Sequence, residues 1–223
     1  GKPAPVSKQE IAFGTVCSIT LYERNAEKVL DKCFARLQEL DDIFNINEEN
    51  SDISNINKNA GIVPVKISEE AFYVLQKATE FAKLTEGNFD PTIGPLVKTW
   101  NIMGSNPKVP TKSKILEAKN LVDYKKLLLD ENGKTAYIEK SMSLDVGGIA
   151  KGFAADEMVK ILKDNKITYG IVNLGGNIFA YGSKKTEKNP ESWKIGIKNP
   201  INPEKGSAFM VKVEDKTVVT SGN

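Results

Sequence analysis

Residues 143–162 read SLDVGGIAKGFAADEMVKIL. A strand-like pattern runs into Asp145, the pair Gly147-Gly148 follows, and Ile149–Asp164 then carries apolar residues at helical spacing. A glycine pair lets a ligand approach the backbone closely, and a helix N-terminus presents free N–H groups and a partial positive charge. The pattern predicts a strand, a turn and a helix, in which the turn holds a phosphate, holds a metal ion, or packs the strand closely on the helix.

The glycines of this turn match neither of the standard phosphate-binding motifs. The dinucleotide motif GxGxxG fails because Ile149 stands at a glycine position, and the P-loop motif fails because Phe153 follows Gly152 where a lysine is required. Lys151 falls in the first turn of the predicted helix, where the helix dipole disfavours a cation. We therefore expect its ammonium group either in solvent or in contact with a phosphate.

Three further helices are predicted around this segment. Ala26–Phe44 is strongly amphipathic. Ser68 is placed to cap a helix over Glu69–Thr85, and Thr111 to cap one over Lys112–Val122. The segment FNINEENSDISNINKNAG is rich in Asn, Ser and acidic residues and is predicted as a loop with at most one short turn. The segment NFDPTIGPLVKTWNI is predicted as an ordered loop with at most a short helix.

Strands are predicted at both ends of the chain. Ile11–Tyr22 alternates and is β-branched, and LLLDENGKTAYIE reads as a hairpin around Asn132-Gly133. The closing strands are predicted over Thr168–Asn173, Asn177–Tyr181, Trp193–Lys198, Ala208–Val213 and Thr217–Thr220. Because βαβ repetition is lacking, the predicted class is α+β, with mixed, largely antiparallel sheets and flanking helices.

Composition excludes several kinds of function within these 223 residues. Lys and Arg number 31 against 29 Asp and Glu, which argues against nucleic-acid binding. The histidine count is zero, which excludes a Ser-His-Asp triad, a His-ligated zinc and a His general base here. The start GKPAPVSKQE, residues 1–10, is predicted to be a flexible tether. Cys17 and Cys33 are expected as buried small hydrophobes rather than as a disulfide framework.

Two other motifs have a local structural interpretation, and one of them could also contact a ligand. The pair Gly175-Gly176 in LGGN indicates a tight turn or a bulge between two strands. Asp90 in GNFDPTIGPL precedes a proline, and it either caps its own loop or contacts a ligand.

The motifs occur in one order: FGTVCSITLY, NSDISNIN, GNFDPTIGPLVKTW, SLDVGGIAKGFAAD, GIVNLGGNIFAYG, WKIGIKNP and TVVTSGN. This ordered set resembles the FAD:protein FMN transferases, the ApbE-like flavin transferase family, from about Ile11 to Asn223. The resemblance implies an ApbE-type, T-fold-like structure, with residues 11–223 forming the N-terminal part of a flavin transferase domain.

The resemblance also implies a reaction. Family members bind FAD with magnesium, and a Thr or Ser hydroxyl of a target flavoprotein, typically a redox-complex subunit, attacks the FMN phosphorus while AMP leaves. Members are commonly lipoproteins or secreted, so an extracytoplasmic location with a lipid-anchored membrane tether is expected. Two alternatives stay open, a magnesium-dependent FAD pyrophosphatase and an FAD-binding module without turnover.

Residues are assigned by their position in the family motifs. The implied FAD contacts are Phe13, Asn47, Asn88, Phe89, Asp90, Asp145 and Lys151, and the Gly148 carbonyl is the implied magnesium ligand. Phe13 is expected to form an apolar wall against a ring, and Lys151 to neutralise the pyrophosphate or bond a nucleotide oxygen. Asn47 falls where some members have tyrosine and others asparagine, which keeps FAD hydrolysis open.

The sequence departs from the family pattern in one respect. It stops just after TSGN, whereas members continue with a segment that holds a histidine and with Asp and Thr side chains that complete the metal site. No catalytic residue is therefore assigned in this chain, and the histidine is expected beyond Asn223. Residues 1–223 alone are expected to be inactive as a transferase.

Overall fold

The computed structural model describes residues 4–102, 104–105, 107–183 and 192–221. The chain divides into two compact units, which are described separately: unit 1 comprises the residues up to Glu39 and from Lys151 onward, and unit 2 comprises Leu40–Ala150. The helices α1 (Ala26–Phe44) and α6 (Gly147–Asp164) each contribute residues to both units. The single domain predicted over 11–223 thus contains two units.

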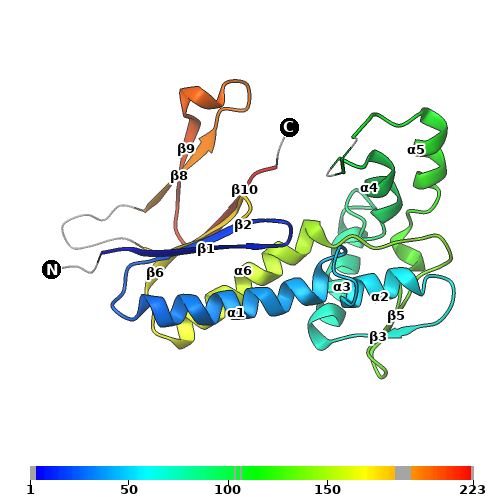
Figure 1. Cartoon of the computed structure of the whole chain (residues 1–223), viewed down its shortest axis with the longest axis horizontal. Helices are drawn as coiled ribbons and strands as arrows, with labels where there is room; N and C mark the ends of the chain where they lie inside the picture. Colours follow the sequence, from blue (N-terminus) through cyan, green and yellow to red (C-terminus); the bar gives the residue numbers. More distant parts are fainter. Residues whose placement is uncertain (1–3, 103, 106, 184–191, 222–223) are drawn as a thin grey trace. The chain divides into compact units, whose positions relative to one another are not determined.

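Unit 1 is built on a five-stranded sheet with strand order β1-β2-β6-β7-β10, in which every neighbouring pair is antiparallel (Figure 1). A separate antiparallel hairpin is formed by β8 and β9. The strands are β1 Val6–Ala12, β2 Thr15–Leu21, β6 Tyr169–Leu174, β7 Asn177–Gly182, β8 Trp193–Lys198, β9 Ser207–Val213 and β10 Lys216–Val219, with a 3-10 turn, η2, at Pro203–Lys205. The predicted α+β class with largely antiparallel sheets is confirmed.

The N-terminal part of the chain differs from the prediction. The single strand predicted over Ile11–Tyr22 is a hairpin, because Phe13 and Gly14 both have positive φ, +53° and +67°. Positive φ at both central residues is the type I′ geometry that joins two strands through a two-residue loop. The tether predicted over 1–10 is wrong for residues 6–10, which belong to β1; residues 1–3 lie outside the described residues.

One face of this sheet packs against α1 and α6. The helices lie side by side and antiparallel, since Lys32 Nζ donates to Asn165 Oδ1 (2.8 Å) while Arg36 pairs with Glu157 (3.0 Å). The bounds predicted for α1 are confirmed, and α6 begins at Gly147 rather than Ile149. The fully buried core residues of this layer include Cys17, Ile19, Leu21, Leu30, Cys33, Val172 and Leu174.

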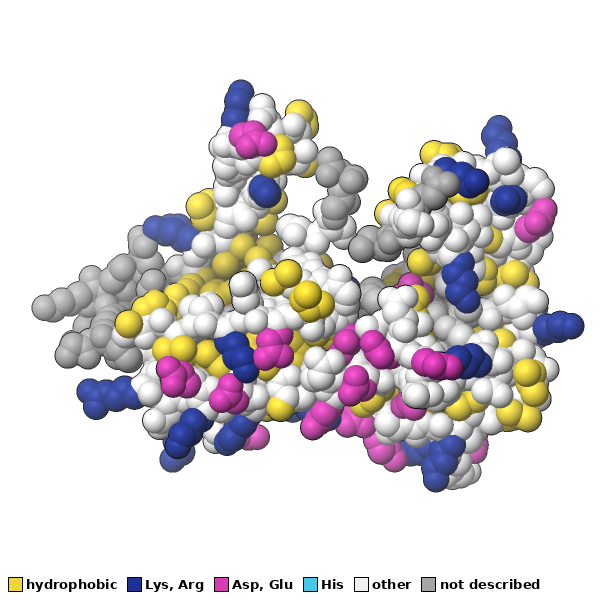
Figure 2. Space-filling view, in the orientation of Figure 1, with side chains coloured by type: hydrophobic (Ala, Val, Ile, Leu, Met, Phe, Trp, Pro, Cys, Tyr) yellow, Lys and Arg dark blue, Asp and Glu magenta, His cyan; other side chains and the backbone are white. Residues whose placement is uncertain are grey.

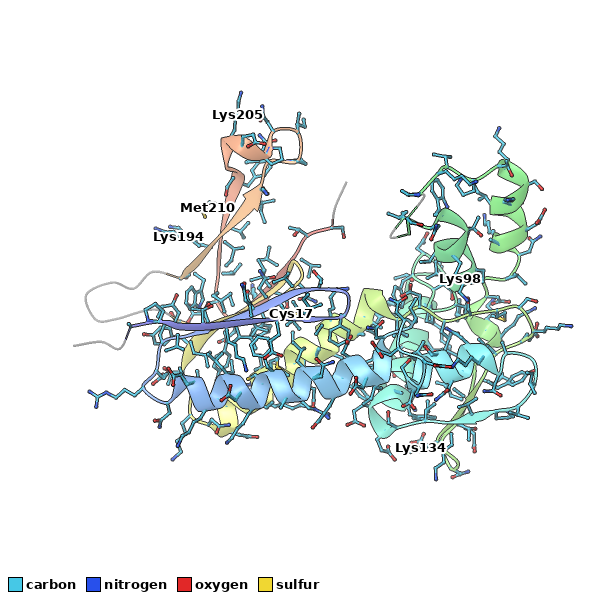
Figure 3. The ribbon with its side chains drawn as sticks, viewed as in Figure 1. Cys17, Lys98, Lys134, Lys194, Lys205 and Met210 are labelled. Atoms are coloured by element: carbon cyan, nitrogen blue, oxygen red, sulfur yellow. The ribbon has the colours of Figure 1, made fainter. Side chains whose placement is uncertain are left out.

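Both cysteines are free and buried, as predicted (Figure 3 shows Cys17 among the packed side chains). Burial raises the pKa of the Cys33 thiol to about 12. The thiolate is the reactive form of cysteine, so Cys33 serves packing in the folded chain.

The other face of the sheet packs against the base of the β8–β9 hairpin. Trp193 and Val213 join Ala180 in a small apolar cluster, and Trp193 Nε1 donates to the Tyr181 carbonyl (3.2 Å). The outer part of the hairpin is exposed, with Met210 visible on it in Figure 3.

Among the described residues, none of the helices combines the length and apolar character needed to cross a membrane. Acidic and basic side chains are interspersed along the visible face of α1 (Figure 2).

Unit 2 is mainly helical and carries a small antiparallel sheet of order β3-β5-β4. Its elements are α2 Asp52–Lys58, β3 Val65–Lys66, α3 Glu69–Leu84, α4 Gly94–Trp100, α5 Lys112–Lys119, the 3-10 turn η1 Tyr124–Lys126, β4 Leu128–Asp130 and β5 Thr135–Tyr137. The predicted caps are confirmed, because Ser68 accepts from Ala71 N and Thr111 from Lys114 N. The two segments predicted as loops contain the short helices α2 and α4.

Two helices of unit 2 end earlier in the sequence than predicted. The helix predicted to end at Val122 ends at Lys119, because the chain tightens into a turn in which Val122 N bonds the Lys119 carbonyl (3.1 Å). The helix predicted to end at Thr85 ends at Leu84, with Thr85 as its cap and Gly87 at φ +82° just beyond it. A left-handed glycine after the cap is a common way to end a helix.

A side-chain clamp fixes the segment that enters α6. Asn57, in α2, donates from Nδ2 to the Leu144 carbonyl (3.0 Å) and accepts from Leu144 N at Oδ1 (2.6 Å). Leu144 is 1% exposed, so both of its backbone groups need a protein partner. One carboxamide satisfies both groups and fixes the backbone immediately before Asp145.

We predict that Glu157→Gln destabilises the chain in a pH-dependent manner. Burial alone raises the pKa of the Glu157 carboxyl, but hydrogen bonds from Lys160 and Arg36 outweigh it and hold the pKa below the usual value of 4.5. The stabilisation is therefore present above pH 4.5 and is lost as pH falls through the lower, folded-state pKa. At neutral pH the substitution should cost about 1 kcal/mol of unfolding free energy by denaturant titration.

The matched control is Glu39→Gln, because Glu39 also pairs with Arg36 but its side chain is 64% exposed. We expect little effect from the control at any pH. An equal loss in both variants, or a loss for Glu157→Gln that does not shrink in acid, would contradict the assignment.

We predict that Asn57→Ala lowers the unfolding free energy by about 2 kcal/mol or more, since it leaves two buried backbone groups of Leu144 without partners. Asn55→Ala is the control, because Asn55 lies in the same helix and its side chain bonds only the exposed Asn50 carbonyl (3.2 Å). Thermal unfolding of the two variants tests this difference. Equal losses of stability in the two variants would show that the two hydrogen bonds to Leu144 contribute nothing beyond the effect of the substitutions on the helix itself.

Candidate functional site

Two of the predicted ligand segments lie next to each other in unit 2. Asp145 N donates to the Pro91 carbonyl (2.9 Å), and Gly94 N donates to the Ser143 carbonyl (3.1 Å). A Cβ on Gly148 would lie 3.1 Å from Phe89 Cε2, so the Phe89 ring packs directly on this glycine. The structure thus brings the Asn88–Asp90 segment beside the turn that begins α6.

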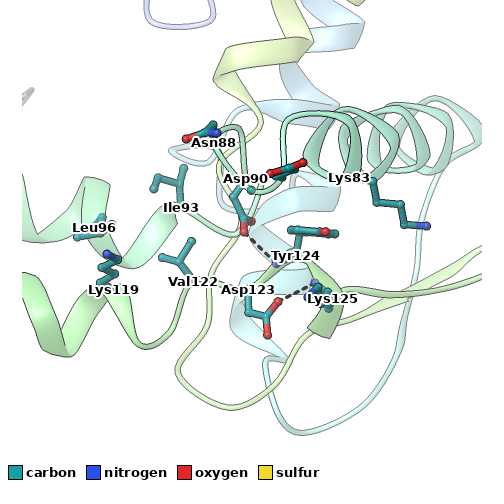
Figure 4. A pocket seen from close by; sticks show the side chains of 12 residues that line it. Lys83, Asn88, Asp90, Ile93, Leu96, Lys119, Val122, Asp123, Tyr124 and Lys125 are labelled. Atoms are coloured by element: carbon teal, nitrogen blue, oxygen red, sulfur yellow. Dashed lines mark hydrogen bonds between the residues drawn. The ribbon is translucent and has the colours of Figure 1, made fainter.

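The Asn88–Asp90 segment presents its side chains to two sides. Asn88 and Asp90 line an open cavity of about 580 Å³ (Figure 4). The Phe89 ring instead faces Gly148. The cavity is of a size common for small-molecule sites. Its lining residues are Lys83, Glu86, Gly87, Asn88, Asp90, Ile93, Leu96, Lys119, Val122, Asp123, Tyr124 and Lys125. The lining includes both acidic and basic side chains, so the cavity carries no single charge preference.

The Asp90 carboxylate is held by the surrounding loop. Its Oδ1 accepts from Thr92 N (2.8 Å) and Thr92 Oγ1 (2.6 Å), and its Oδ2 accepts from Tyr124 N (2.9 Å; Figure 4). Thr92 is fully buried, and its hydroxyl also accepts from Asp123 N (2.9 Å). These bonds match the structural interpretation of Asp90, in which the side chain caps its own loop. A ligand would have to bond carboxylate lone pairs that these hydrogen bonds do not use. Asn88 bonds the Thr85 carbonyl (2.8 Å) through Nδ2.

The glycine turn at the start of α6 is ordered by Asp145. Asp145 Oδ1 accepts from Gly147 N (2.9 Å), and the Val146 carbonyl accepts from Ile149 N and Ala150 N. Gly147 and Gly148 are exposed, and N–H groups in a first helical turn have no partner within the helix. The close contact at Gly148 is made by the Phe89 ring and not by the strand predicted before the turn, of which only an isolated bridge between Ser143 and Ile93 forms. The phosphate and metal interpretations stay predictions, and the helix N-terminus favours an anion over a cation.

The described residues do not by themselves fit a magnesium site. They contain no group of three Asp, Glu, Cys or His side chains placed to hold a metal. Gly148 lies at the N-terminal end of α6, which disfavours a cation, and Asp145 Oδ1 already accepts from Gly147 N. The assignment of Gly148 as a metal ligand stays a prediction.

The remaining predicted residues are placed as follows. Phe13 is half-buried at the tip of the β1–β2 hairpin of unit 1, and Lys151 is half-buried on α6 of the same unit. The hairpin tip packs on the β6–β7 turn, since a Cβ on Gly175 would overlap the Thr15 side chain. Asn47, in unit 2, is exposed, and its backbone N–H donates to Asn45 Oδ1 (2.9 Å).

Sequence reasoning missed two residues that organise the site. Asn57 fixes the backbone before Asp145, and Thr92 holds both Asp90 and Asp123. A signal for Asn57 exists in the sequence, because asparagine is a poor helix former and yet stands beside the apolar Ile56. Thr92 has no comparable signal, since threonine after a proline is ordinary in a loop.

Comparison with known proteins identifies the relatives of this chain. The family model described as the ApbE family matches residues 13–223. A Treponema pallidum protein named FAD:protein FMN transferase is 32% identical over 231 residues, which cover 97% of this chain and 64% of that protein. A Klebsiella pneumoniae protein of the same name is 29% identical, covering 97% of this chain and 66% of the other. The chain therefore spans about two thirds of the length of these relatives, 64% and 66%.

Solved structures agree with this result. The ApbE protein of Thermotoga maritima superposes with a TM-score of 0.88 at 28% identity, over 98% of this chain and 71% of the other. The flavin transferase ApbE of Vibrio cholerae superposes with a TM-score of 0.84 at 23% identity, over 99% and 72%. These superpositions confirm the predicted fold. The family match over residues 13–223, with the 32% identical relative, shows that this chain belongs to the ApbE family.

Proposed function

We propose that this chain is part of an FAD:protein FMN transferase, which moves FMN from FAD to a Thr or Ser hydroxyl of a target flavoprotein. The observation that carries the proposal is the packing of the Asn88–Asp90 segment on the turn that begins α6, through Phe89 and Gly148. Both segments contain residues that the resemblance to the family predicts to contact FAD. The names of the relatives support the same activity.

The proposed reaction is a displacement at phosphorus. The acceptor hydroxyl oxygen forms a bond to the phosphorus of the FMN half, the bridging P–O bond of the pyrophosphate breaks, and AMP leaves with the bridging oxygen. The hydroxyl proton passes to a base, which we place outside this histidine-free chain. The residues present here serve to bind and orient FAD, which is a large part of catalysis in phosphoryl-type transfer.

The α6 N-terminus and Lys151 supply the charge complement in this proposal. Gly147 N already donates to Asp145 Oδ1, so in this proposal the N–H group of the exposed Gly148 suits a phosphate oxygen, and the Lys151 ammonium suits the same negative charge. A lysine in the first turns of a helix costs some stability through the dipole, and a bound pyrophosphate would offset that cost.

We further propose a metal requirement, a partner and a location. Magnesium would neutralise the pyrophosphate when bound, and its remaining ligands would come from outside the described residues. The acceptor would be a redox-complex subunit or another extracytoplasmic flavoprotein, and the protein would be tethered to a membrane by a lipid. These proposals rest on the family resemblance alone.

The proposed function is tested by incubating the chain, and separately the longer Treponema pallidum relative, with FAD and magnesium. Bound FAD is followed by flavin fluorescence and AMP by chromatography. We expect residues 1–223 to bind FAD without releasing AMP, and the longer relative to release AMP only with a threonine-containing acceptor that gains the mass of FMN. AMP and free FMN without an acceptor would favour the pyrophosphatase alternative, and absence of FAD binding would refute the proposal.

We predict that Lys151→Met weakens FAD binding by about tenfold, the effect of losing one charge-assisted hydrogen bond. Binding should also become less sensitive to salt, because an ion pair with phosphate is removed. Riboflavin, which has no phosphate, should bind both forms equally. Lys163→Met, at the exposed last turn of the same helix, is the control. Equal weakening of riboflavin and FAD would show that Lys151 does not meet the pyrophosphate.

A further inference from the structure

A second open cavity lies in unit 2, where α4 packs on α5. Its volume is about 540 Å³, which is within the range of small-molecule sites. None of the predicted FAD contacts lines it, so it is separate from the cavity that Asn88 and Asp90 line. The residues that matter below are Pro95 and Lys98 of α4, Lys114, Glu117 and Ala118 of α5, and Ser143.

Ser143 brings an unsatisfied hydroxyl to this cavity. The residue is 4% exposed, and its Oγ has no hydrogen-bond partner among the described residues, although its carbonyl accepts from Gly94 N. The hydroxyl is not sealed in the core, because the one fully buried side-chain oxygen or nitrogen without a partner in the described part of the chain is Asn177 Oδ1. Its remaining accessible surface therefore lies where Ser143 lines the cavity. Polar groups this deep are nearly always paired, so the partner has to come from the cavity.

The charge around the cavity is positive. Within the described ranges, the ammonium groups of Lys98 and Lys114 have neither an ion-pair nor a hydrogen-bond partner (Figure 3 labels Lys98). Lys114 lies in the first turn of α5, which also carries Lys112 and no acidic residue, so the positive end of the helix dipole adds to the same field. The one acidic side chain among the described lining residues is Glu117, whose Oε1 accepts from Ser113 Oγ (2.8 Å). Two cations and one carboxylate leave a net charge of +1.

An apolar wall accompanies these polar groups. Pro95 and Ala118 are buried, and Leu121, in the turn after α5, is half-buried and also lines the cavity. Lys114, Ala118 and Leu121 follow one another at the three- and four-residue spacing of a single helical face. One side of the cavity thus offers apolar surface beside the ammonium groups.

We propose that the cavity between α4 and α5 binds a small organic carboxylate, which accepts from the Ser143 hydroxyl and is neutralised by Lys98 and Lys114. This inference goes beyond the proposed function, because it assigns a second ligand site to unit 2. Hydroxyl and ammonium groups both donate to a carboxylate, and hydrogen bonds to a charged acceptor are the strong ones. A monoanion balances the net charge of +1, whereas a phosphate ester dianion leaves excess negative charge beside Glu117. The apolar wall receives the body of the ligand.

The test measures binding of benzoate to residues 1–223 by NMR of the backbone amide signals, with benzamide as a neutral compound of the same shape. Benzoate should shift the signals of α4, α5 and residues 141–143, and it should bind about tenfold more tightly than benzamide. Phenyl phosphate, a dianion, should bind more weakly than benzoate. Benzoate should also raise the thermal unfolding midpoint, because it binds the folded chain alone.

Two variants isolate the proposed contacts. Ser143→Ala and Lys98→Met should each weaken benzoate binding about tenfold, the effect of losing one charge-assisted hydrogen bond. Ser143→Ala should not lower the unfolding midpoint of the ligand-free chain, because it removes a hydroxyl that has no protein partner. Lys112→Met is the matched control, since it removes one charge from the same helical turn as Lys114 but does not line the cavity. This control should change benzoate binding by no more than about twofold, because an exposed charge outside the cavity is screened.

The contrary outcomes are distinguishable. Shifts absent from α4 and α5 would overturn the site, and equal binding of benzoate and benzamide would overturn the choice of a carboxylate. Tighter binding of phenyl phosphate would make the cavity a phosphate site. Should Ser143→Ala fail to fold, Lys98→Met still decides, because equal losses in Lys98→Met and Lys112→Met would contradict a direct contact. FAD should not displace benzoate, so a failure of FAD binding would refute the proposed function and leave this inference standing.

Discussion

The backbone of residues 143–145 is buried where the chain turns into α6, and its polar groups require partners from elsewhere in unit 2. Asn57 satisfies both backbone groups of Leu144, the Pro91 carbonyl accepts from Asp145 N, and Gly94 N donates to the Ser143 carbonyl. Burying any of these groups unpaired would cost about 1–3 kcal/mol. The requirement therefore brings α2, the Asn88–Gly94 segment and the start of α6 to one place, and the candidate site is built on that junction.

Polar side chains near the site fall into two kinds. Asp90 and Asp145 have their oxygens engaged by neighbouring backbone N–H groups, so they hold the loops in position. The Ser143 hydroxyl, in contrast, has no partner among the described residues, although Ser143 is 4% exposed. Satisfied groups stabilise the ligand-free fold, whereas unsatisfied ones lower its stability and are kept when a ligand satisfies them.

The assignment of the family-motif residues as FAD contacts stays a prediction, and the structure adds where each of these residues lies. The structure brings Phe89 and Gly148 together and turns Asn88 and Asp90 toward a separate cavity, which no linear motif specifies. Asn57 and Thr92 lie inside two of the motifs but were assigned no role, and their partners lie 87 and 31 positions away in the sequence. Such bonds depend on which loops meet, and a single sequence holds no record of that.

The sequence by itself determined the elements whose signals are local. The apolar spacing of Ala26–Phe44, the Ser68 and Thr111 caps and the antiparallel α+β class all follow from residues within a few positions of one another. Only the tertiary structure decided that Phe13-Gly14 is a hairpin tip, since the alternating pattern of Ile11–Tyr22 continues through it and the β1–β2 pairing selects the turn. It likewise decided that Ser143 lines one cavity with Lys98 and Lys114, because strand pairing and helix packing, which are long-range, bring together residues that the chain keeps apart.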